Sequence, residues 1–482
     1  MMSSSKDSDL KTKLLQIECH FTWDLKEDDT DMEDLQTRIK DQIELDLGKE
    51  AGVARTVSFL AYIKYLKGFR EEAMADLLKS EELTREYYGR DCEKHLIVTY
   101  GDLTWLHYHM GDYVKCQSYL EKLDEIKNKF PTDSMSVLHP EVYGDKGWTF
   151  LKFSYKYYDK ALECFKKALE LEPMESEWNA GYAIALYRTE KELTSVNDSP
   201  AIKQLRRALE VNPRDAVLMV LLGLKLAVYK RFGEAEELVE NALEMSPECP
   251  HVTRYVGKFL RQQGHVDKSI DLLHRALKRT SQSAIIHHQL ALCYKRKKIE
   301  LQNSGRFHAK EAEIQELLRK NIYHLEKATS LKPHFIYAMA ELALSYAEVK
   351  NFNKAQEHFK EALEKATDKN DGLQVVHFYY GQFHQYHKKC ELLAIEHYTK
   401  GLELQKNSAE GKQCAHKLKR IAEKRVSRDP GDAEACGILG FVYKIQGEKE
   451  EAIKWYDKAV VCDMDNDNYL SALCELRLSL QE

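Results

Sequence analysis

The segment LGFVYKIQGEKEEAIKWYDKA, from Leu439 to Ala459, decides the expected fold. Its small and aromatic residues recur at fixed intervals, at Leu439, Gly440, Tyr443, Ala452, Tyr456 and Ala459. This spacing is typical of the tetratricopeptide unit of about 34 residues, in which two antiparallel helices pack through those positions. The same spacing recurs in residues 222–247 and 342–362. Because one helical hairpin cannot bury its own apolar face, such units stack, and their concave surface normally binds a partner.

The repeats predict an all-α protein, a tetratricopeptide-repeat superhelix (α-solenoid) with a central basic pocket. Helices within residues 1–48 are expected to pack on a continuous array over residues 49–482. The predicted units are 54–87, 97–130, 142–174, 175–214, 216–249, 250–283, 284–334, 336–369, 373–407 and 433–466, with a non-consensus basic helix at 408–432. Two units exceed the period, by a polar loop from Thr189 to Ser199 and by a charged stretch interrupted near Asn303, Ser304 and Gly305.

Composition restricts the class of protein. The 482 residues include 72 Lys and Arg against 78 Asp and Glu, so the formal net charge of -6 argues weakly against a polyanion ligand. The position of the positive charge matters more than its sum, since acidic outer helices can enclose a basic interior. The 11 cysteines form no C-x-x-C pair, and no apolar run approaches the ~20 residues that span a bilayer. We therefore expect a cytoplasmic protein with reduced cysteines and no membrane association.

Positive charge collects at one register of the repeats. In tetratricopeptide arrays the groove is lined by a stripe of the first helix at i, i+4 and i+7. In the 250–283 unit this stripe holds Arg254, Lys258 and Arg261, and in the next unit it holds His288 and Lys295. In the 216–249 unit it holds Val220, Leu224 and Ala227, which predicts an apolar sector beside the positive one. The alternative is a charged face exposed to solvent.

Lys152 occupies the position at which a packing tyrosine is expected. A lysine in a packing stripe is costly unless an anion or a carboxylate compensates it. Two alternatives do not require a ligand. The aliphatic part of Lys152 could pack while its ammonium group reaches solvent, or the ammonium group could pair with a structural glutamate. Aromatic residues surround it in sequence, among them Trp148 and Tyr158. Cations interleaved with aromatic rings are also what a single-stranded nucleic acid requires, for its phosphates and its bases.

Motifs of catalysis and cofactor binding are absent from the sequence. It contains no G-x-x-x-x-G-K-[ST], G-x-G-x-x-G, H-E-x-x-H or G-x-S-x-G motif. His287 and His288 are adjacent on a helix and point in different directions, which makes them a poor metal chelate. We expect no enzyme activity and no required cofactor.

Several segments resemble the interferon-induced proteins with tetratricopeptide repeats. These segments are ECHFTW from Glu18, KGWTFLKFSYKYYDKA from Lys146, AGYAIALYR from Ala180, RYVGKFLRQQG from Arg254, HHQLALCYK from His287, LGFVYKIQGE from Leu439 and SALCELRLSL from Ser471. The resemblance extends from about residue 10 to the end. It implies a cytosolic antiviral protein that engulfs the 5′ end of single-stranded RNA and holds its triphosphate, or in some relatives an unmethylated cap, in a positive pocket. It also implies related family members or other immune signalling proteins as possible partners.

The resemblance also implies site residues. The expected 5′-phosphate contacts are Arg38, Gln42, Lys152, Arg188 and Arg254. The resemblance places contacts to nucleotides or backbone at Tyr158, Tyr255, His288 and Gln289. The cations Lys258, Arg261 and Lys295, which the repeat register places in the groove, are expected to join them. Lys417, Lys419, Arg420 and Lys424 are expected along the RNA body.

Two further expectations concern the cap and a metal ion. Trp148 and Ile184 match the cap-pocket positions of relatives, but Val217 stands where cap-binding relatives carry an aromatic residue, so the sequence argues against a cap site. Glu33 or Asp34 matches an acidic position that in relatives acts through a bound cation, such as a Mg²⁺ ion on the triphosphate.

The rival function is that of an adaptor whose groove binds an extended peptide or an acidic protein tail. A row of Arg and Lys serves either ligand, and the family motifs favour RNA. A nuclease or nucleotidase would need a metal and carboxylate constellation, which the sequence lacks.

Overall fold

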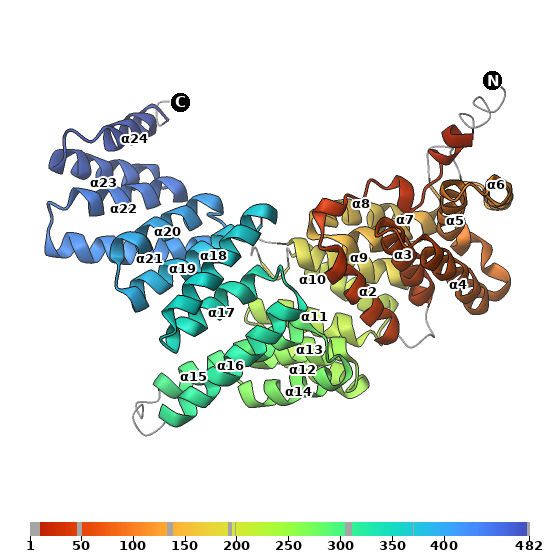
Figure 1. The fold of residues 1–482 in the computed structure, drawn as a ribbon, viewed down its shortest axis with the longest axis horizontal. Helices are drawn as coiled ribbons and strands as arrows, with labels where there is room; N and C mark the ends of the chain where they lie inside the picture. The colour runs from red at the N-terminus through yellow and green to blue at the C-terminus, as the bar shows by residue number, and fades with distance from the viewer. Residues whose placement is uncertain are drawn as a thin grey trace. The chain divides into compact units, whose positions relative to one another are not determined.

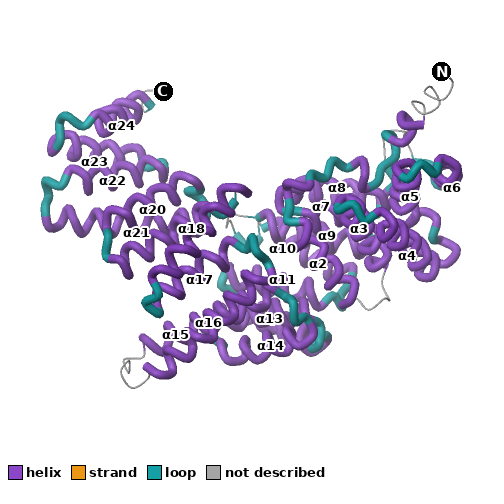
Figure 2. Tube along the Cα trace, viewed as in Figure 1, coloured by secondary structure: helices purple, strands orange, loops and turns teal. Residues whose placement is uncertain are grey.

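The computed structural model describes residues 10–45, 51–132, 138–190, 195–197, 199–303, 311–369 and 371–479. Within these residues every regular element is a helix, as the tube in Figure 2 shows. The chain divides into two compact units, Met1–Ser281 and Gln282–Glu482. The predicted all-α fold is confirmed, whereas the predicted limits of the repeats and of the N-terminal region stay predictions. Residues 1–9, 46–50, Ser304, Gly305 and part of the predicted 189–199 loop lie outside the described residues.

The described part of the first unit is a succession of helices (Figure 1). Its α-helices are α2 (Met32–Leu45), α3 (Ala51–Leu66), α4 (Arg70–Tyr88), α5 (Ile97–His109), α6 (Tyr113–Lys129), α7 (Pro140–Phe153), α8 (Tyr158–Leu171), α9 (Ser176–Thr189), α10 (Pro200–Val211), α11 (Ala216–Val228), α12 (Phe232–Met245), α13 (Pro250–Gln262) and α14 (Val266–Arg279). Short 3-10 helices are η1 (His20–Thr22), η2 (Glu27–Asp29), η3 (Gly89–Asp91), η4 (Glu93–Leu96) and η5 (Tyr155–Tyr157).

The second unit continues the same pattern of paired helices. They are α15 (Ala284–Asn303), α16 (Glu311–Leu331), α17 (Ile336–Glu348), α18 (Phe352–Lys369), α19 (Leu373–Gln382), α20 (Glu391–Leu404), α21 (Ala409–Arg428), α22 (Ala433–Gln446), α23 (Lys449–Cys462) and α24 (Asp467–Leu478). A π-helical segment, η7 (Phe383–Lys388), continues α19.

The signature residues hold the two helices of a hairpin together. A Cβ atom at Gly440 of α22 would lie 2.8 Å from the ring of Tyr456 on α23, which is closer than a side chain tolerates. The glycine therefore permits the close approach of the two helices, and the tyrosine ring fills the space. Tyr456 is 5% exposed, and Ala452 and Ala459 are fully buried.

The N-terminal segment is anchored in the first unit by a buried histidine. His20 is 1% exposed, and its Nδ1 lies 2.6 Å from Asp102 Oδ2 on α5. Its Nε2 lies 3.1 Å from Thr149 Oγ1 on α7. This arrangement satisfies both ring nitrogens, so the histidine of the ECHFTW segment holds the segment against two helices.

The predicted apolar sector of the groove is wrong. Val220 is fully buried and Leu224 is 2% exposed, within the core that α11 shares with its neighbours. These two side chains pack between helices, since the helix is apolar on almost every face and its inner stripe is covered as well.

Candidate functional site

Three cations from three helices of the first unit act electrostatically on one half-buried imidazole, that of His251 on α13. The pKa of His251 is lowered to about 4, first by burial and then by these nearby positive charges. The cations are Arg254 of α13, Lys152 of α7 and Arg188 of α9. We call these three residues the basic cluster. His251 is therefore neutral at pH 7 and adds no positive charge.

Lys152 is half-buried and lies against α3. Its Nζ donates a hydrogen bond of 2.9 Å to the Thr56 hydroxyl and lies 5.7 Å from the centre of the Trp148 ring. The Thr56 hydroxyl that accepts this hydrogen bond is itself uncharged.

Arg188 is exposed at the end of α9 and is held by α7 and by the start of α8. Its Nη1 donates to the Leu151 carbonyl at 3.1 Å and to the Tyr158 hydroxyl at 3.2 Å. The guanidinium also lies over the Tyr158 ring, 5.4 Å from its centre. Arg188 and Tyr158, predicted separately as a phosphate contact and a nucleotide contact, are thus brought into contact.

Arg254 lies over the ring of Tyr255, 4.6 Å from its centre. Within the described residues its Nε is buried and has no hydrogen-bond partner. Burial raises the pKa of Tyr255, but the charges of Arg254 and Arg188 outweigh burial and lower it. Burial lowers the pKa of Lys258, and Arg261 and Arg254 add to that shift while Tyr255 opposes it. The predicted row of α13 therefore packs its positive charges closely enough for them to repel one another.

The early helix α2 brings Arg38 to the same region. Its Nη2 donates to the Lys152 carbonyl at 3.5 Å, and its Nε pairs with Asp34 at 3.0 Å. Gln42 follows one turn later and is half-buried. Glu33 is largely exposed and pairs with Lys67 at 2.6 Å. The two predicted acidic positions are thus each engaged with a protein cation.

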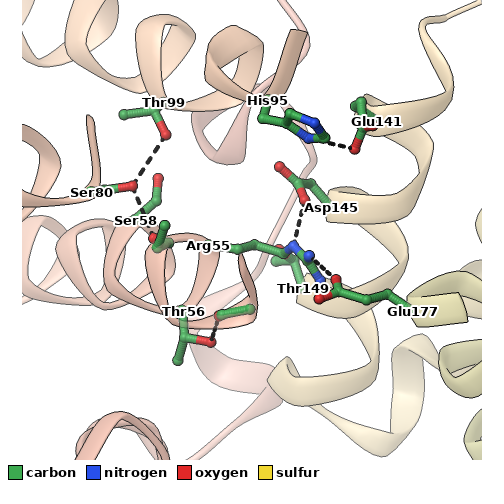
Figure 3. A network of polar contacts seen from close by, with 12 residues as sticks. Arg55, Thr56, Ser58, Ser80, His95, Thr99, Glu141, Asp145, Thr149 and Glu177 are labelled. Atoms are coloured by element: carbon green, nitrogen blue, oxygen red, sulfur yellow. Dashed lines mark hydrogen bonds and ion pairs between the residues drawn. The ribbon is translucent and has the colours of Figure 1, made fainter. Parts of the chain in front are cut away.

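Two residues that the sequence analysis missed, Arg55 and Thr56, lie on α3. Figure 3 shows Arg55 between Asp145 and Glu177. The Nε of Arg55 lies 2.5 Å from Asp145 Oδ1. The same guanidinium lies 6.0 Å from the centre of the Trp148 ring. Trp148 therefore has two cations near its ring. Ile184, the other predicted cap position, is half-buried among apolar side chains. The arginine within the apolar run VARTVSFLAYI was the available signal for Arg55.

In the second unit the predicted residues meet an unpredicted carboxylate. Glu341 of α17 is 6% exposed and accepts from His288 at 2.8 Å and from Lys295 at 3.1 Å. Tyr379 donates to the same carboxylate at 2.8 Å. Burial opposes ionisation, but Lys295 and His288 hold the pKa of Glu341 well below its usual range. Within the described residues, the buried Oε1 of Gln289 has no hydrogen-bond partner.

The basic residues of α21 lie on a helix surface and contact tyrosines. Lys417 donates to the Tyr386 hydroxyl at 2.8 Å, and Lys419 lies 3.8 Å from the centre of the Tyr443 ring. Arg420 and Lys424 are exposed. The described residues contain no group of three or more His, Cys, Asp or Glu side chains placed to hold a metal ion.

Comparison with known proteins agrees with the helical hairpins. The tetratricopeptide repeat family matches residues 230–284 and, in a second form, residues 141–173 and 433–460. The antiviral innate immune response effector IFIT1 of Homo sapiens is 36% identical over 475 residues, 97% of this chain and 99% of that protein. The human interferon-induced protein with tetratricopeptide repeats 2 is 33% identical, over 94% of this chain and 95% of that protein. The chain belongs to the interferon-induced proteins with tetratricopeptide repeats.

Solved structures of this family share the fold over almost the whole chain. The human IFIT1 dimer with m7Gppp-AAAA has a TM-score of 0.82 at 36% identity and covers 95% of this chain and 100% of that one. The human IFIT1 dimer with PPP-AAAA has a TM-score of 0.80 at 35% identity, with the same coverage. Among the residues that the structure describes, this chain has no helix that is long and apolar enough to cross a membrane.

Proposed function

We propose that this protein binds the 5′-triphosphate end of single-stranded RNA in the basic cluster of its first unit. It thereby sequesters non-self RNA in the cytoplasm as an antiviral effector, without regard to base sequence. The observation that carries this proposal is that all three cations of the basic cluster lower the pKa of the half-buried His251 imidazole, together with the buried Nε of Arg254, which has no hydrogen-bond partner among the described residues.

The electrostatics of the cluster favour a compact polyanion. Gathering cations around a partly desolvated site raises the free energy of the empty protein, and an anion relieves that repulsion. The buried Nε of Arg254 is a charged donor with no partner among the described residues. A phosphate oxygen there would form a charge-assisted hydrogen bond, which contributes about 1.5–3 kcal/mol.

The residues beside the cluster suit the nucleotides that follow a triphosphate. The rings of Tyr158 and Tyr255 lie next to Arg188 and Arg254, respectively. Rings provide stacking or ribose contacts that any base accepts, whereas a sequence code requires two or three base-reading side chains for each nucleotide. Sequence-independent binding follows from this set of side chains.

A triphosphate suits the site better than a cap. The Trp148 ring has Arg55 and Lys152 near it, at 6.0 and 5.7 Å, and a methylated base that stacked there would compete with both cations. The structures of human IFIT1 carry either PPP-AAAA or m7Gppp-AAAA. For this chain we infer that the triphosphate is the preferred 5′ end.

The proposed activity is binding without catalysis, and it requires no resident cofactor. Asp34 and Glu33 are engaged by Arg38 and Lys67, so these carboxylates do not form a metal site by themselves. A Mg²⁺ ion would arrive with the triphosphate. Related family members or other immune signalling proteins are proposed partners, and residues His288, Gln289 and Lys295 remain proposed RNA contacts.

Filter binding of one RNA sequence with triphosphate, cap and hydroxyl 5′ ends tests the proposal. We expect the triphosphate RNA to bind at least about tenfold more tightly than the hydroxyl RNA, with a steep dependence on salt because phosphate contacts release counterions. A triphosphate RNA whose 5′ end is blunt and paired should bind much more weakly than one with unpaired 5′ nucleotides. Equal binding of triphosphate and hydroxyl ends would contradict the proposal and favour an adaptor that binds an acidic protein segment.

A further inference from the structure

A cavity of about 670 Å³ in the first unit contains no member of the basic cluster. Its walls come from α3, from the end of α4, from η3 and η4, from the start of α7, and from the turn that joins α8 to α9 with the first residues of α9. The volume lies within the range of about 300–1,000 Å³ that is typical of small-ligand pockets. We call this cavity the acidic pocket.

Carboxylates dominate its charged lining. They are Asp91, Glu141, Glu172, Glu175 and Glu177. The fixed positive charges are Arg55 and Lys94. Of the two histidines in the wall, His139 has a pKa that is lowered chiefly by burial, so it is neutral at pH 7. The pocket is therefore net negative, although it lies in the same unit as the basic cluster.

Both cations of the wall are already neutralised by carboxylates. Arg55 is paired with Asp145 and Glu177, as Figure 3 shows. Lys94 lies 3.4 Å from Glu141, which also lies 3.1 Å from His95. These contacts leave little positive charge for an anionic ligand.

Three carboxylates in the wall have no such counterion. Among the described residues no ion pair reaches Asp91, Glu172 or Glu175, and Glu172 and Glu175 are half-buried. The Glu175 side chain accepts a hydrogen bond of 3.3 Å from the backbone N–H of Glu177, which caps α9. One of its oxygens and both of those of Glu172 are consequently available to a cation.

Aromatic rings form the remaining wall. Tyr88 stacks on His95 with ring centres 3.4 Å apart, Trp178 is 2% exposed, and the neighbouring Tyr87 is 54% exposed. Ammonium and guanidinium groups are attracted to the faces of such rings, and carboxylates beside the rings add ion pairs. An aliphatic stem would pack on the same rings.

We propose that the acidic pocket binds an organic cation, an ammonium or guanidinium group on a flexible aliphatic stem. Glu172 and Glu175 supply the ion pairs, and Tyr87 with Tyr88 supplies the aromatic wall. Such a cation is available from two sources, a Lys or Arg side chain of a partner protein or a free polyamine. A metal ion is a poorer candidate, because the described residues hold no group of three or more ligands placed for one.

Isothermal titration of the full chain with two probes tests this site. The probes are spermidine and the blocked tripeptide acetyl-Gly-Arg-Gly-amide. The test variant is Glu172→Gln with Glu175→Gln, because glutamine retains the side-chain oxygen that caps α9. The matched control is Glu163→Gln with Glu170→Gln, which removes two exposed carboxylates of α8 that do not line the pocket.

We expect the double variant in the pocket to bind the preferred probe about tenfold more weakly than the unmodified chain, since two charge-assisted contacts are lost. The control should stay within about twofold, because distant exposed charges are screened by salt. Tighter binding of the tripeptide would assign a protein partner, and tighter binding of spermidine would assign a polyamine. No binding of either probe to the unmodified chain, or an equal loss in both variants, would overturn the proposal. Binding of triphosphate RNA should be unchanged in the pocket variant, which separates this site from the proposed function.

Discussion

The cations on α13 and those on α15 occupy the same register of two successive repeats, yet the protein treats them differently. In the first unit Arg254, together with Lys152 and Arg188, acts on a histidine that is neutral at pH 7. In the second unit His288 and Lys295 close on the buried carboxylate of Glu341. A shared position in the repeat therefore does not imply a shared electrostatic role. The groups that the fold places beside a cation decide its electrostatic role.

Removing cations from the basic cluster should have the largest effect. We expect Lys152→Ala to weaken triphosphate RNA binding about tenfold or more, and Arg254→Glu to weaken it further, because the charge is reversed as well as lost. Lys295→Ala should cost much less, since Glu341 already neutralises Lys295. Filter binding with circular dichroism melting measures both affinity and fold. Normal binding by both cluster variants would exclude the cluster as the phosphate site, and unfolding would show that Lys152 is structural.

The second prediction concerns stability. Glu341→Gln should lower the free energy of unfolding by about 3 kcal/mol, because it leaves Lys295 and His288 partly buried without their counterion. The pKa of Glu341 is lowered on folding, so its stabilisation is present above the ordinary glutamate pKa and is lost as the pH falls below it. Urea unfolding between pH 3 and pH 7 measures this pH-dependent contribution to the free energy of unfolding. An unchanged pH profile in Glu341→Gln would show that the ion pairs contribute nothing.

A smaller effect is expected from the pH dependence of RNA binding. His251 has a pKa of about 4 in the empty protein, because burial and three cations disfavour its protonation. A bound triphosphate would offset those cations and raise the pKa of His251, so binding should take up a proton. The affinity of the unmodified chain, relative to that of His251→Gln, should rise a few-fold as the pH falls from 7 to 5.5. The glutamine variant corrects for protonation of the phosphate itself. Parallel pH profiles would place His251 away from the bound phosphate.

The smallest effect should come from α21. Replacing Lys417, Arg420 and Lys424 with glutamine should reduce, by at most about three, the slope of log binding constant against log salt concentration for long RNAs. The same replacements should barely change the affinity for a short 5′ fragment. Contacts at an exposed helix surface follow the backbone, and salt screens them. Salt titrations of a long and a short triphosphate RNA make the comparison. An equal loss for both lengths would place these residues in the 5′ site or in the fold.

Much of the fold was predictable, because local spacing determines how a helical hairpin packs. Gly440 and Tyr456 are 16 positions apart in the sequence, and this spacing alone predicts that a glycine faces a ring across two helices. The apolar inner stripe at Val220 and Leu224 was predicted wrongly, since a period does not report which neighbouring helix covers a given face.

Parts of the candidate site were also predictable. Lys152 was conspicuous as a lysine at a packing position, and Arg254 as one of three cations in a stripe. Thr56 and Glu341 were missed, because each acquires its role only from a helix that lies far away in the sequence. His251 was missed because two of the three cations that lower its pKa, Lys152 and Arg188, come from other helices. No spacing rule connects Glu341 to His288 across 53 positions.

The sequence by itself determined the class of the fold, the family, and the helices that carry the cations, because these depend on short-range periodicity and on specific motifs. Only the tertiary structure decided which groups each cation meets. That outcome depends on the groups within a few ångströms of each side chain: a hydroxyl opposite Lys152, a neutral histidine beside Arg254, and a carboxylate opposite Lys295. Electrostatic energy varies with distance and burial in space, and separation along the chain does not report either one.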